Sequence, residues 1–245
     1  MNNQETREKL HQMRLYGMER AFTNSMSSGM RHDVTPDELV AHLVDAEWDD
    51  RYNRKLERLL SQAAFRYQAH LSQIDFRTER NLSKNDIMRF GECDWVRKGE
   101  NIIITGATGV GKSFVASALG HAACVQGFKV LYTNSLKLFS QLKFAQADGS
   151  YFKEMDKIKR KDVVIFDDFG LKPLDAQARL ILLELLEDRS GLKPVIIASQ
   201  LPAKSWYDML EDATIADAIC DRLIHTAHKI DLKGESMRKE KHKKS

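Results

Sequence analysis

The stretch NIIITGATGVGKSFVASALG, residues 101–120, decides the fold and the chemistry of this chain. The apolar run 102–105 is followed by a glycine-rich turn and then by a segment with helical spacing. Glycines in such a turn let successive backbone N–H groups point at one phosphate, and the amino end of the following helix attracts its negative charge. The stretch therefore predicts a strand, a phosphate-binding turn and a helix.

The turn matches the pattern G-x-x-x-x-G-K-[ST] at every position, in the strand-to-helix context that the motif requires. Lys112 is expected to place its ammonium group between the β- and γ-phosphates of a nucleotide, and Ser113 to offer its hydroxyl to Mg²⁺. A chance glycine turn is the alternative, and the flanking elements argue against it. We predict that ATP and Mg²⁺ are the cofactors and that the contacting residues are Gly106, Ala107, Thr108, Gly109, Val110, Gly111, Lys112, Ser113 and Phe114.

The second half of such a site is expected at the end of another strand. In VVIFDDFG, residues 163–170, an apolar run ends in two acids. We expect Asp167 to hold Mg²⁺ through the water shell of the metal, and Asp168 to orient and deprotonate the attacking water. Two solvated acids are the alternative, which the phosphate-binding turn upstream disfavours. Most ATPases of this type carry glutamate at the second position, and the shorter Asp168 departs from that pattern.

A third strand, in PVIIASQLP (194–202), ends in Ser199 and Gln200. If this strand lies beside the acidic one, Gln200 is in a position to touch the γ-phosphate or to place the attacking water. Many strands end in serine or glutamine, so this pattern alone is not specific.

From residue 100 onward, short apolar runs alternate with helical stretches. Strands are predicted at 102–105, 130–133, 163–167, 195–199 and 229–232. This alternation is typical of a parallel α/β sheet sandwiched by helices. No strand pattern precedes residue 100, so we predict a small all-helical N-terminal domain, 1–72, that contacts DNA or a partner, followed by an ATPase domain with a basic tail, 73–245.

Helix signals in the first third are local. Residues 1–32 are interpreted as one helix followed by a loop of small residues. Thr35 is the expected N-cap of a second helix, with Pro36 at its first position and Glu38 closing a capping box. Apolar residues at helical spacing predict a further helix over residues 52–68.

Charge is distributed unevenly along the chain. Residues 33–50 hold seven acids and no Lys or Arg, whereas 51–89 hold nine bases against four acids. Each run is either a solvated helix face or a contact surface for nucleic acid or a partner. Residues 134–161 hold seven bases against three acids. There Lys137 and Lys143 flank Phe139 and Phe144, and we expect both phenylalanines in the core of an amphipathic helix. The basic tail 233–244 either frays in solvent or adds phosphate contacts.

Composition excludes several classes of protein. Hydrophobic residues make up 42% of the chain, which is sufficient for a packed core. No apolar run has the length of a membrane span, and the charged N-terminus lacks the apolar segment of a signal peptide. Three cysteines lie far apart without metal-ligand spacing, which indicates buried thiols in a reducing compartment. We therefore expect a cytoplasmic protein with no membrane partner.

The motifs GATGVGKS, VVIFDDFG, ASQLP, DAICDRL and LKGESMR, in this order, resemble those of AAA+ ATPases of the initiator and helicase-loader group. The set is most similar to the IstB-like ATPases, the helper proteins of bacterial insertion sequences. The resemblance covers about residues 80–240, and the segments LHQMRLYGMERAF and LVAHLVDAEWDDRYNRKLERLL are also similar to that family. The ordered set is far more specific than the phosphate-binding turn alone, which many NTPases share.

The resemblance implies roles for two arginines. Arg222 matches the arginine finger that such proteins insert into the site of a neighbouring subunit, where it is worth about 10³-fold or more in rate. Arg238 matches the second sensor arginine, which contacts the γ-phosphate in its own subunit. We expect no long helical lid after Leu232, which departs from most AAA+ proteins and suits this subfamily.

The resemblance also implies a function. It implies an ATPase that assembles with ATP into a homo-oligomeric ring or helix on duplex DNA, with little sequence preference. In initiator-type ATPases the segment that corresponds to 134–161 faces the centre of the assembly, which implies that some of its lysines contact the DNA backbone. Its partner would be the transposase of the element, which it would assist in target selection and strand transfer. A replicative helicase loader, similar to DnaC, has the same motifs and stays open as an alternative. A small-molecule P-loop kinase would need a substrate pocket and an arginine-rich lid after the fourth strand, and neither is visible.

Overall fold

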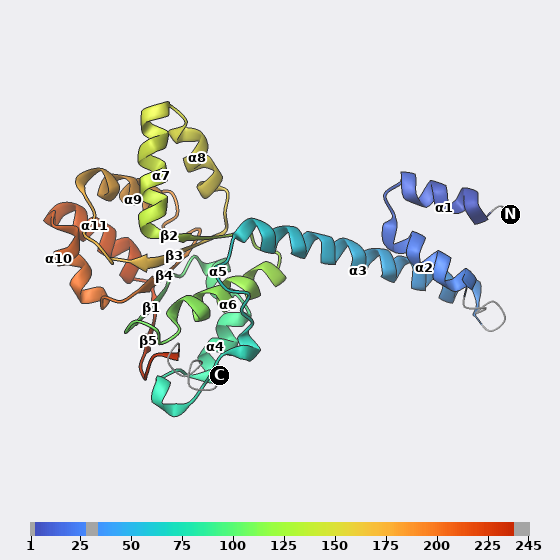
Figure 1. Ribbon diagram of the computed structural model, residues 1–245, viewed down its shortest axis with the longest axis horizontal. Coiled ribbons are helices and arrows are strands. Elements are labelled where there is room, and N and C mark those ends of the chain that lie inside the picture. Colours follow the sequence, from blue (N-terminus) through green and yellow to red (C-terminus); the bar gives the residue numbers. More distant parts are fainter. Residues whose placement is uncertain (1–2, 28–33, 238–245) are drawn as a thin grey trace. The chain divides into compact units, whose positions relative to one another are not determined.

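The computed structural model describes residues 3–27 and 34–237 of the 245-residue chain (Figure 1). The chain divides into two compact units, residues 1–58 and 59–245. The boundary falls within one helix, α3 (Pro36–Ala63). The predicted domain boundary at residue 72 therefore lies inside the second unit.

The first unit is helical, as predicted, but its helices are arranged differently. Residues before 32 form two helices, α1 (Asn3–Gln12) and α2 (Tyr16–Ser27), separated by a turn in which Arg14 has a positive φ of 58°. The two helices predicted after residue 35 are one, α3, which ends at Ala63 rather than at residue 68. Because no glycine lies within α3 and its one proline is its first residue, nothing in the sequence interrupts it.

The predicted start of α3 is confirmed. The backbone N–H of Thr35 donates to the Glu38 carboxylate at 2.8 Å, and the N–H of Glu38 donates to Thr35 Oγ1 at 3.3 Å. Two otherwise unpaired backbone donors are thus satisfied reciprocally, as in a capping box.

A buried acid holds the helices of the first unit together. Glu47 on α3 is only 5% exposed, and its carboxylate accepts the N–H groups of Gly17 at 2.8 Å and Met18 at 3.3 Å. A negative charge at the amino end of α2 has the favourable sign for the helix dipole. Arg51 also donates to this carboxylate, and Asp50 pairs with Arg20. Part of the acidic run 33–50 therefore acts inside the unit rather than as a solvated face.

The second unit is built on a five-stranded sheet in the order β2-β3-β4-β1-β5, in which every paired strand is parallel. The strands are β1 (Ile102–Gly106), β2 (Val130–Asn134), β3 (Val163–Phe169), β4 (Val195–Ser199) and β5 (His228–Leu232). All five predicted strands are confirmed to within two residues at each end. Because the strands are parallel, their carboxyl ends lie on one edge of the sheet, which brings the predicted site residues of β1, β3 and β4 together.

Helices cover both faces of this sheet (Figure 1). The helices of this unit after α3 are α4 (Lys84–Gly91), α5 (Asp94–Lys98), α6 (Lys112–Val125), α7 (Ser135–Asp148), α8 (Tyr151–Lys159), α9 (Ala176–Glu187), α10 (Trp206–Leu210) and α11 (Ala213–Ile224). Successive strand residues point to opposite faces. Phe166 joins the core formed with α7, α9 and α11. Ile165 faces α6, where it lies so close to Gly120 that a β-carbon there would touch it.

Short 3₁₀ turns complete the unit. They are η2 (Leu71–Gln73), η3 (Thr78–Arg80) and η4 (Ala203–Ser205). Within the described residues, no helix is long and apolar enough to cross a membrane.

The prediction that both phenylalanines of α7 lie in the core is half right. Phe139 is 2% exposed, whereas Phe144 is 77% exposed. The buried face of α7 carries Leu138, Phe139, Leu142 and Ala145, at helical spacing. Residue 144 falls outside that face, so its ring is in solvent.

The cysteines are free thiols. Cys93 and Cys124 are buried, as predicted, and Cys220 is partly buried. Burial raises the pKa of the Cys93 thiol to about 11 and that of Cys124 to about 12. Both are therefore protonated at neutral pH and behave as small core residues.

One buried arginine fixes the beginnings of β3 and β4. Arg189 is 2% exposed, and its guanidinium donates to the backbone carbonyls of Ile158, Lys161, Asp162 and Pro194 at 3.0–3.3 Å. Burial lowers the pKa of Arg189 to about 10, so the group stays charged at neutral pH. These bonds tie the end of α8 to β3 and β4, two of the strands that carry site residues.

Substituting Arg189 with methionine should leave these carbonyls buried and unpaired. We expect Arg189→Met to lower the free energy of unfolding by about 3 kcal/mol, measured by urea denaturation followed by near-UV circular dichroism. The matched control is Arg160→Met at an exposed position. Equal stability of the two variants would contradict the role given to Arg189.

Candidate functional site

The glycine-rich turn connects β1 to α6 and opens at the amino end of that helix. Gly111 is the N-cap of α6 and has a φ of 99°, and Gly109 has a φ of 86°, both in the region that favours glycine. A β-carbon on Gly109 would overlap the side chain of Ser236, which folds over the turn. The first turn of α6 carries no acid. The N–H groups and the dipole at this end of the helix are therefore suited to an anion.

Lys112 lies against the turn that precedes it. The residue is 8% exposed, and its Nζ donates to the carbonyls of Gly106 and Ala107, each at 2.8 Å. These bonds hold the ammonium group against the start of the turn. Together, the turn and this cation would suit a phosphate.

Arg80 is hydrogen-bonded to the turn, a contact that the sequence did not predict. The residue is 5% exposed, and its guanidinium donates to the carbonyls of Val110 and Asp75. Arg80 also accepts the N–H of Lys233 through its own carbonyl at 3.1 Å. An isolated arginine in a segment without a motif carries no sequence signal for such a contact.

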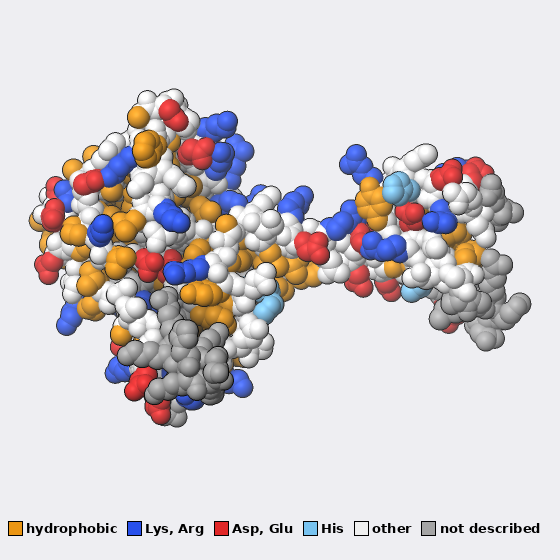
Figure 2. Space-filling view, in the orientation of Figure 1, with side chains coloured by type: hydrophobic (Ala, Val, Ile, Leu, Met, Phe, Trp, Pro, Cys, Tyr) orange, Lys and Arg blue, Asp and Glu red, His pale blue; other side chains and the backbone are white. Residues whose placement is uncertain are grey.

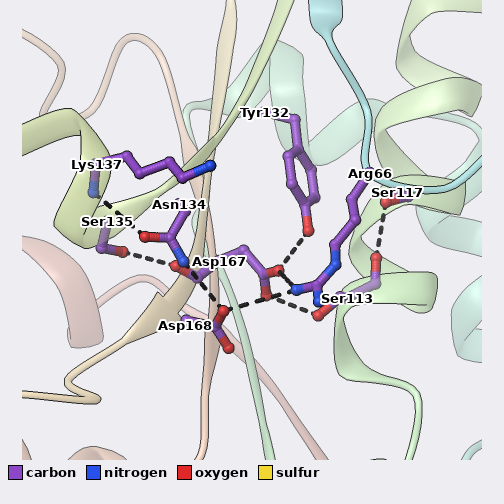
Figure 3. Close-up of polar contacts among 9 residues, drawn as sticks. All are labelled: Arg66, Ser113, Ser117, Tyr132, Asn134, Ser135, Lys137, Asp167 and Asp168. Atoms are coloured by element: carbon purple, nitrogen blue, oxygen red, sulfur yellow. Dashed lines mark hydrogen bonds and ion pairs between the residues drawn. The ribbon is translucent and has the colours of Figure 1, made fainter. Parts of the chain in front are cut away.

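The buried carboxylate of Asp167 is the centre of the site (Figure 3). Asp167 is 2% exposed, and Ser113 Oγ donates to its Oδ1 at 2.8 Å. Its Oδ2 accepts hydrogen bonds from the Tyr132 hydroxyl at 2.5 Å and from Arg66 Nη1 at 3.3 Å. The two predicted metal ligands, on α6 and β3, are thus side by side.

The Ser113 hydroxyl and the Asp167 carboxylate fit Mg²⁺. A hydroxyl and a carboxylate are oxygen ligands of the kind that Mg²⁺ prefers, and the metal usually takes only one or two carboxylates with phosphates and water. Among the described residues there is no group of three or more His, Cys, Asp or Glu side chains that could hold a metal alone. Ser113 and Asp167 would therefore hold the ion together with the phosphates of a nucleotide.

Tyr132 keeps Asp167 oriented, and it too was missed. Burial, and then the hydrogen bond to Asp167, raise the pKa of the Tyr132 hydroxyl. The hydroxyl is therefore a permanent donor at neutral pH. The pattern of β2 predicts a strand but does not indicate which of its residues faces the acid.

Asp168 is held in a strained conformation beside Asp167. Its φ is 55°, and the pairing of β3 with β4 shifts register between Phe166 and Phe169. Left-handed backbone at a non-glycine residue in a bulge is typical of functional sites. Asn134 Nδ2 donates to Asp168 Oδ2 at 3.0 Å, and Asn134 also caps α7 through the N–H of Lys137 (Figure 3). The carboxylate is therefore aimed by the end of β2.

The end of β4 reaches the turn through Gln200. Thr108 Oγ1 donates to Gln200 Oε1 at 2.8 Å, and both residues are exposed. Ser199, in contrast, is fully buried and donates to the carbonyl of Phe169 at 2.7 Å. Of the two strand-end residues, only Gln200 faces the site.

A cavity of about 240 Å³ adjoins the turn. Its lining residues are Tyr67, Gln73, Asp75, Arg80, Gly109, Gly111, Ser113, Phe114 and Met237. The rings of Tyr67 and Phe114 lie 6.2 Å apart, centroid to centroid. The aromatic walls and the nearby acid and amide suit a planar, polar-edged group, and they give Phe114 a place in the site.

Comparison with known proteins decides the family. A family model described as IstB-like ATP binding protein matches residues 8–245. This chain belongs to that family. It is 43% identical, over 98% of both chains, to a putative insertion sequence ATP-binding protein of Sinorhizobium fredii. It is 40% identical to the putative ATP-binding protein of insertion sequence IS1162 from Pseudomonas fluorescens, covering 84% of this chain and 89% of that one.

Solved structures confirm the AAA+ fold of this IstB-like protein. The DnaC helicase loader superposes with a TM-score of 0.60 at 18% identity, covering 68% of this chain and 98% of that one. AMPPCP-bound DnaA from Aquifex aeolicus superposes with a TM-score of 0.60 at 17% identity, covering 74% of this chain and 56% of that one.

Arg222, which the family resemblance matches to an arginine finger, lies away from this site. The carbonyl of Arg222 accepts a hydrogen bond from Asn101 Nδ2 at 2.9 Å, just before the amino end of β1. The turn lies at the opposite end of that strand, so Arg222 is not in the phosphate site of its own chain. Its guanidinium donates to Ala218 O and Glu187. Arg238 and the tail residues that follow it lie outside the described residues.

The backbone conformation of Asp168 gives a stability prediction. Asp168→Gly and Asp168→Ala both remove the carboxylate and differ by one β-carbon. We expect the alanine variant to be less stable by about 1 kcal/mol, because only glycine adopts a φ of 55° without strain. Thermal unfolding of the two variants measures the difference. An alanine variant as stable as the glycine variant would contradict the left-handed conformation.

Proposed function

We propose that this insertion-sequence ATP-binding protein is an ATPase that binds Mg²⁺·ATP, assembles on duplex DNA and assists the transposase of its element in target selection and strand transfer. The observation that carries the proposal is the convergence of Lys112, Ser113 and Asp167. A cationic turn, a hydroxyl and a buried carboxylate at one sheet edge are what a metal-bound triphosphate needs.

Each residue has a step in this scheme. The N–H groups of the turn and Lys112 bind and orient the β- and γ-phosphates, and Ser113 and Asp167 hold the metal. Bound Mg²⁺ supplies positive charge that offsets charge developing on the phosphates. Asp168, aimed by Asn134, accepts a proton from the attacking water. Gln200, at the tip of β4, helps to place that water.

The position of Arg222 favours an assembly. An arginine finger must reach the transferring phosphate, and Arg222 lies at the far end of β1 from the turn. We therefore infer that it acts in the site of a neighbouring copy, which makes hydrolysis a property of a homo-oligomer. The sequence resemblance, which matched Arg222 to the finger, points to the same arrangement.

A basic groove on the second unit supports DNA binding. The groove has a volume of about 740 Å³ and runs beside β2, α7 and α8. Its basic side chains are Lys129, Lys157, Arg160 and Lys161, against Asp148 and Glu154. Figure 2 shows basic side chains gathered over α8. Such a surface suits the phosphate backbone and reads no sequence by itself. A protein that acts on the DNA of a bacterial cell would work in the cytoplasm.

Lys143 is a weaker candidate for DNA than the exposed lysines. It is partly buried and pairs with Asp175 at the start of α9. Lys137, in contrast, is exposed. The helicase-loader alternative shares only the fold at 18% identity, whereas relatives that match nearly the whole chain are named for insertion sequences. This difference favours the transposase as the client, and a pull-down with each candidate partner separates the two.

Removing the ammonium group of Lys112 should remove the response to nucleotide. We expect Lys112→Ala to lower ATP affinity by about 100-fold and to abolish ATP-dependent binding of duplex DNA in an electrophoretic shift assay. Lys204→Ala, at an exposed position in η4, is the matched control. Unchanged DNA binding by Lys112→Ala would remove nucleotide from the mechanism.

The arginine finger can be tested by mixing two variants. Arg222→Ala should bind nucleotide normally and lose turnover by about 10³-fold, and Asp168→Asn should also bind and fail to hydrolyse. Mixing them should restore turnover, because an interface then joins an intact Arg222 to an intact Asp168. The rate of phosphate release measures the turnover of each variant and of the mixture. Full turnover by Arg222→Ala alone would rule out the finger.

A further inference from the structure

The segment that follows α3 is built into the nucleotide site, within the second unit. Ala64, with a φ of 55°, ends the helix, and residues 65–67 then run along α6 and β2. We call residues 64–67 the connector. The Phe65 ring packs edge-on against Tyr132 at 6.2 Å, and a β-carbon on Gly120 would strike it. The Tyr67 ring lines the cavity beside the turn.

Between these two rings, Arg66 points at both acids (Figure 3). Its Nη1 lies 3.3 Å from Asp167 Oδ2 and 3.7 Å from Asp168 Oδ2. The Arg66 side chain is 44% exposed, whereas that of Asp167 is 2% exposed. One cation thus sits between two adjacent carboxylates that would otherwise repel each other.

The contacts divide the oxygens of Asp167 into two roles. Oδ1 faces Ser113, the other proposed metal ligand, while Arg66 and Tyr132 share Oδ2. Partners that hold the remaining oxygen of a metal-binding carboxylate fix its orientation. Arg66 does this for Asp167 and, through the same nitrogen, restrains Asp168.

We propose that Arg66 is a positioning residue for the Mg²⁺·nucleotide site, supplied in cis by the connector, and that loading of the site in turn orders the connector. The inference rests on the proposed function. A triphosphate with one Mg²⁺ is still negatively charged, so the guanidinium remains favourable in the loaded site. Tyr67 adds a second link, because it lines the cavity proposed for the nucleotide.

Through the connector, nucleotide binding would affect α3, the helix that continues into the first unit. Phe65, Arg66 and Tyr67 each touch a different part of the site, and α3 ends immediately before them. Filling the site would therefore stiffen the last turn of α3 and the connector together. No motif in the sequence marks this segment.

The first measurement is the Mg²⁺ concentration that gives half-maximal binding of a fluorescent ADP analogue. We expect Arg66→Gln to raise it by roughly five- to tenfold, and Arg66→Lys to lie between wild type and Arg66→Gln. Arg89→Gln, which removes the exposed pair with Asp86, should match wild type. Binding of the analogue in EDTA should be the same in all four proteins, which shows that the fold is intact.

The second measurement is hydrogen–deuterium exchange over residues 60–70 of the wild-type protein. Mg²⁺ with the analogue should slow exchange in the connector severalfold more than the analogue in EDTA does, and Arg66→Gln should lose that difference. An unchanged or lower Mg²⁺ requirement in Arg66→Gln would overturn the proposal, the lower value meaning that Arg66 competes with the metal. If Arg66→Gln fails to fold, the Mg²⁺ requirement of Arg66→Lys and the hydrogen–deuterium exchange of the wild-type connector test the proposal instead. Failure of the wild-type protein to bind the analogue would contradict the proposed function as well.

Discussion

The second unit depends on one buried negative charge. The Asp167 carboxylate is 2% exposed, and an unpaired charge at that depth would be strongly destabilising. The fold meets this need by bringing donors from separate segments to one point: Ser113 on α6, Tyr132 on β2 and Arg66 on the connector. The groups that satisfy the charge are also those that would place a metal ion. Under the proposed function, the same contacts would therefore serve both stability and nucleotide binding.

Under the proposed function, the parallel strand order separates the residues that bind nucleotide from the arginine that acts on a neighbouring copy. The phosphate turn, both acids and Gln200 share the carboxyl edge of the sheet, so the residues proposed to bind nucleotide lie together within one chain. Arg222 lies at the other end of β1. Under the proposed function, a single copy can bind nucleotide but needs a neighbour to hydrolyse it efficiently, which links turnover to assembly on DNA.

Sequence patterns predicted the parts of the site that are local. The turn, the acid pair and all five strands follow from short motifs and apolar runs, and the family follows from their order. The contacts that sequence reasoning missed join distant segments: Arg66 lies 101 residues from Asp167, and Tyr132 lies 35 residues from it. The two helices predicted after residue 35 proved to be one helix, α3. No glycine or internal proline separates them, so the sequence held no true boundary there. Phe144 was wrongly predicted to be buried because it is aromatic. Its position on α7 lies outside the buried face that carries Phe139.

The most direct test of the central claim is calorimetric titration of the wild-type protein and of Asp167→Asn with a non-hydrolysable ATP analogue, with Mg²⁺ and with EDTA. The account predicts one site per chain whose affinity rises with Mg²⁺ in wild type, and an Mg²⁺ effect that is largely lost in Asp167→Asn. No binding heat in wild type, or the same Mg²⁺ dependence in both proteins, would contradict it.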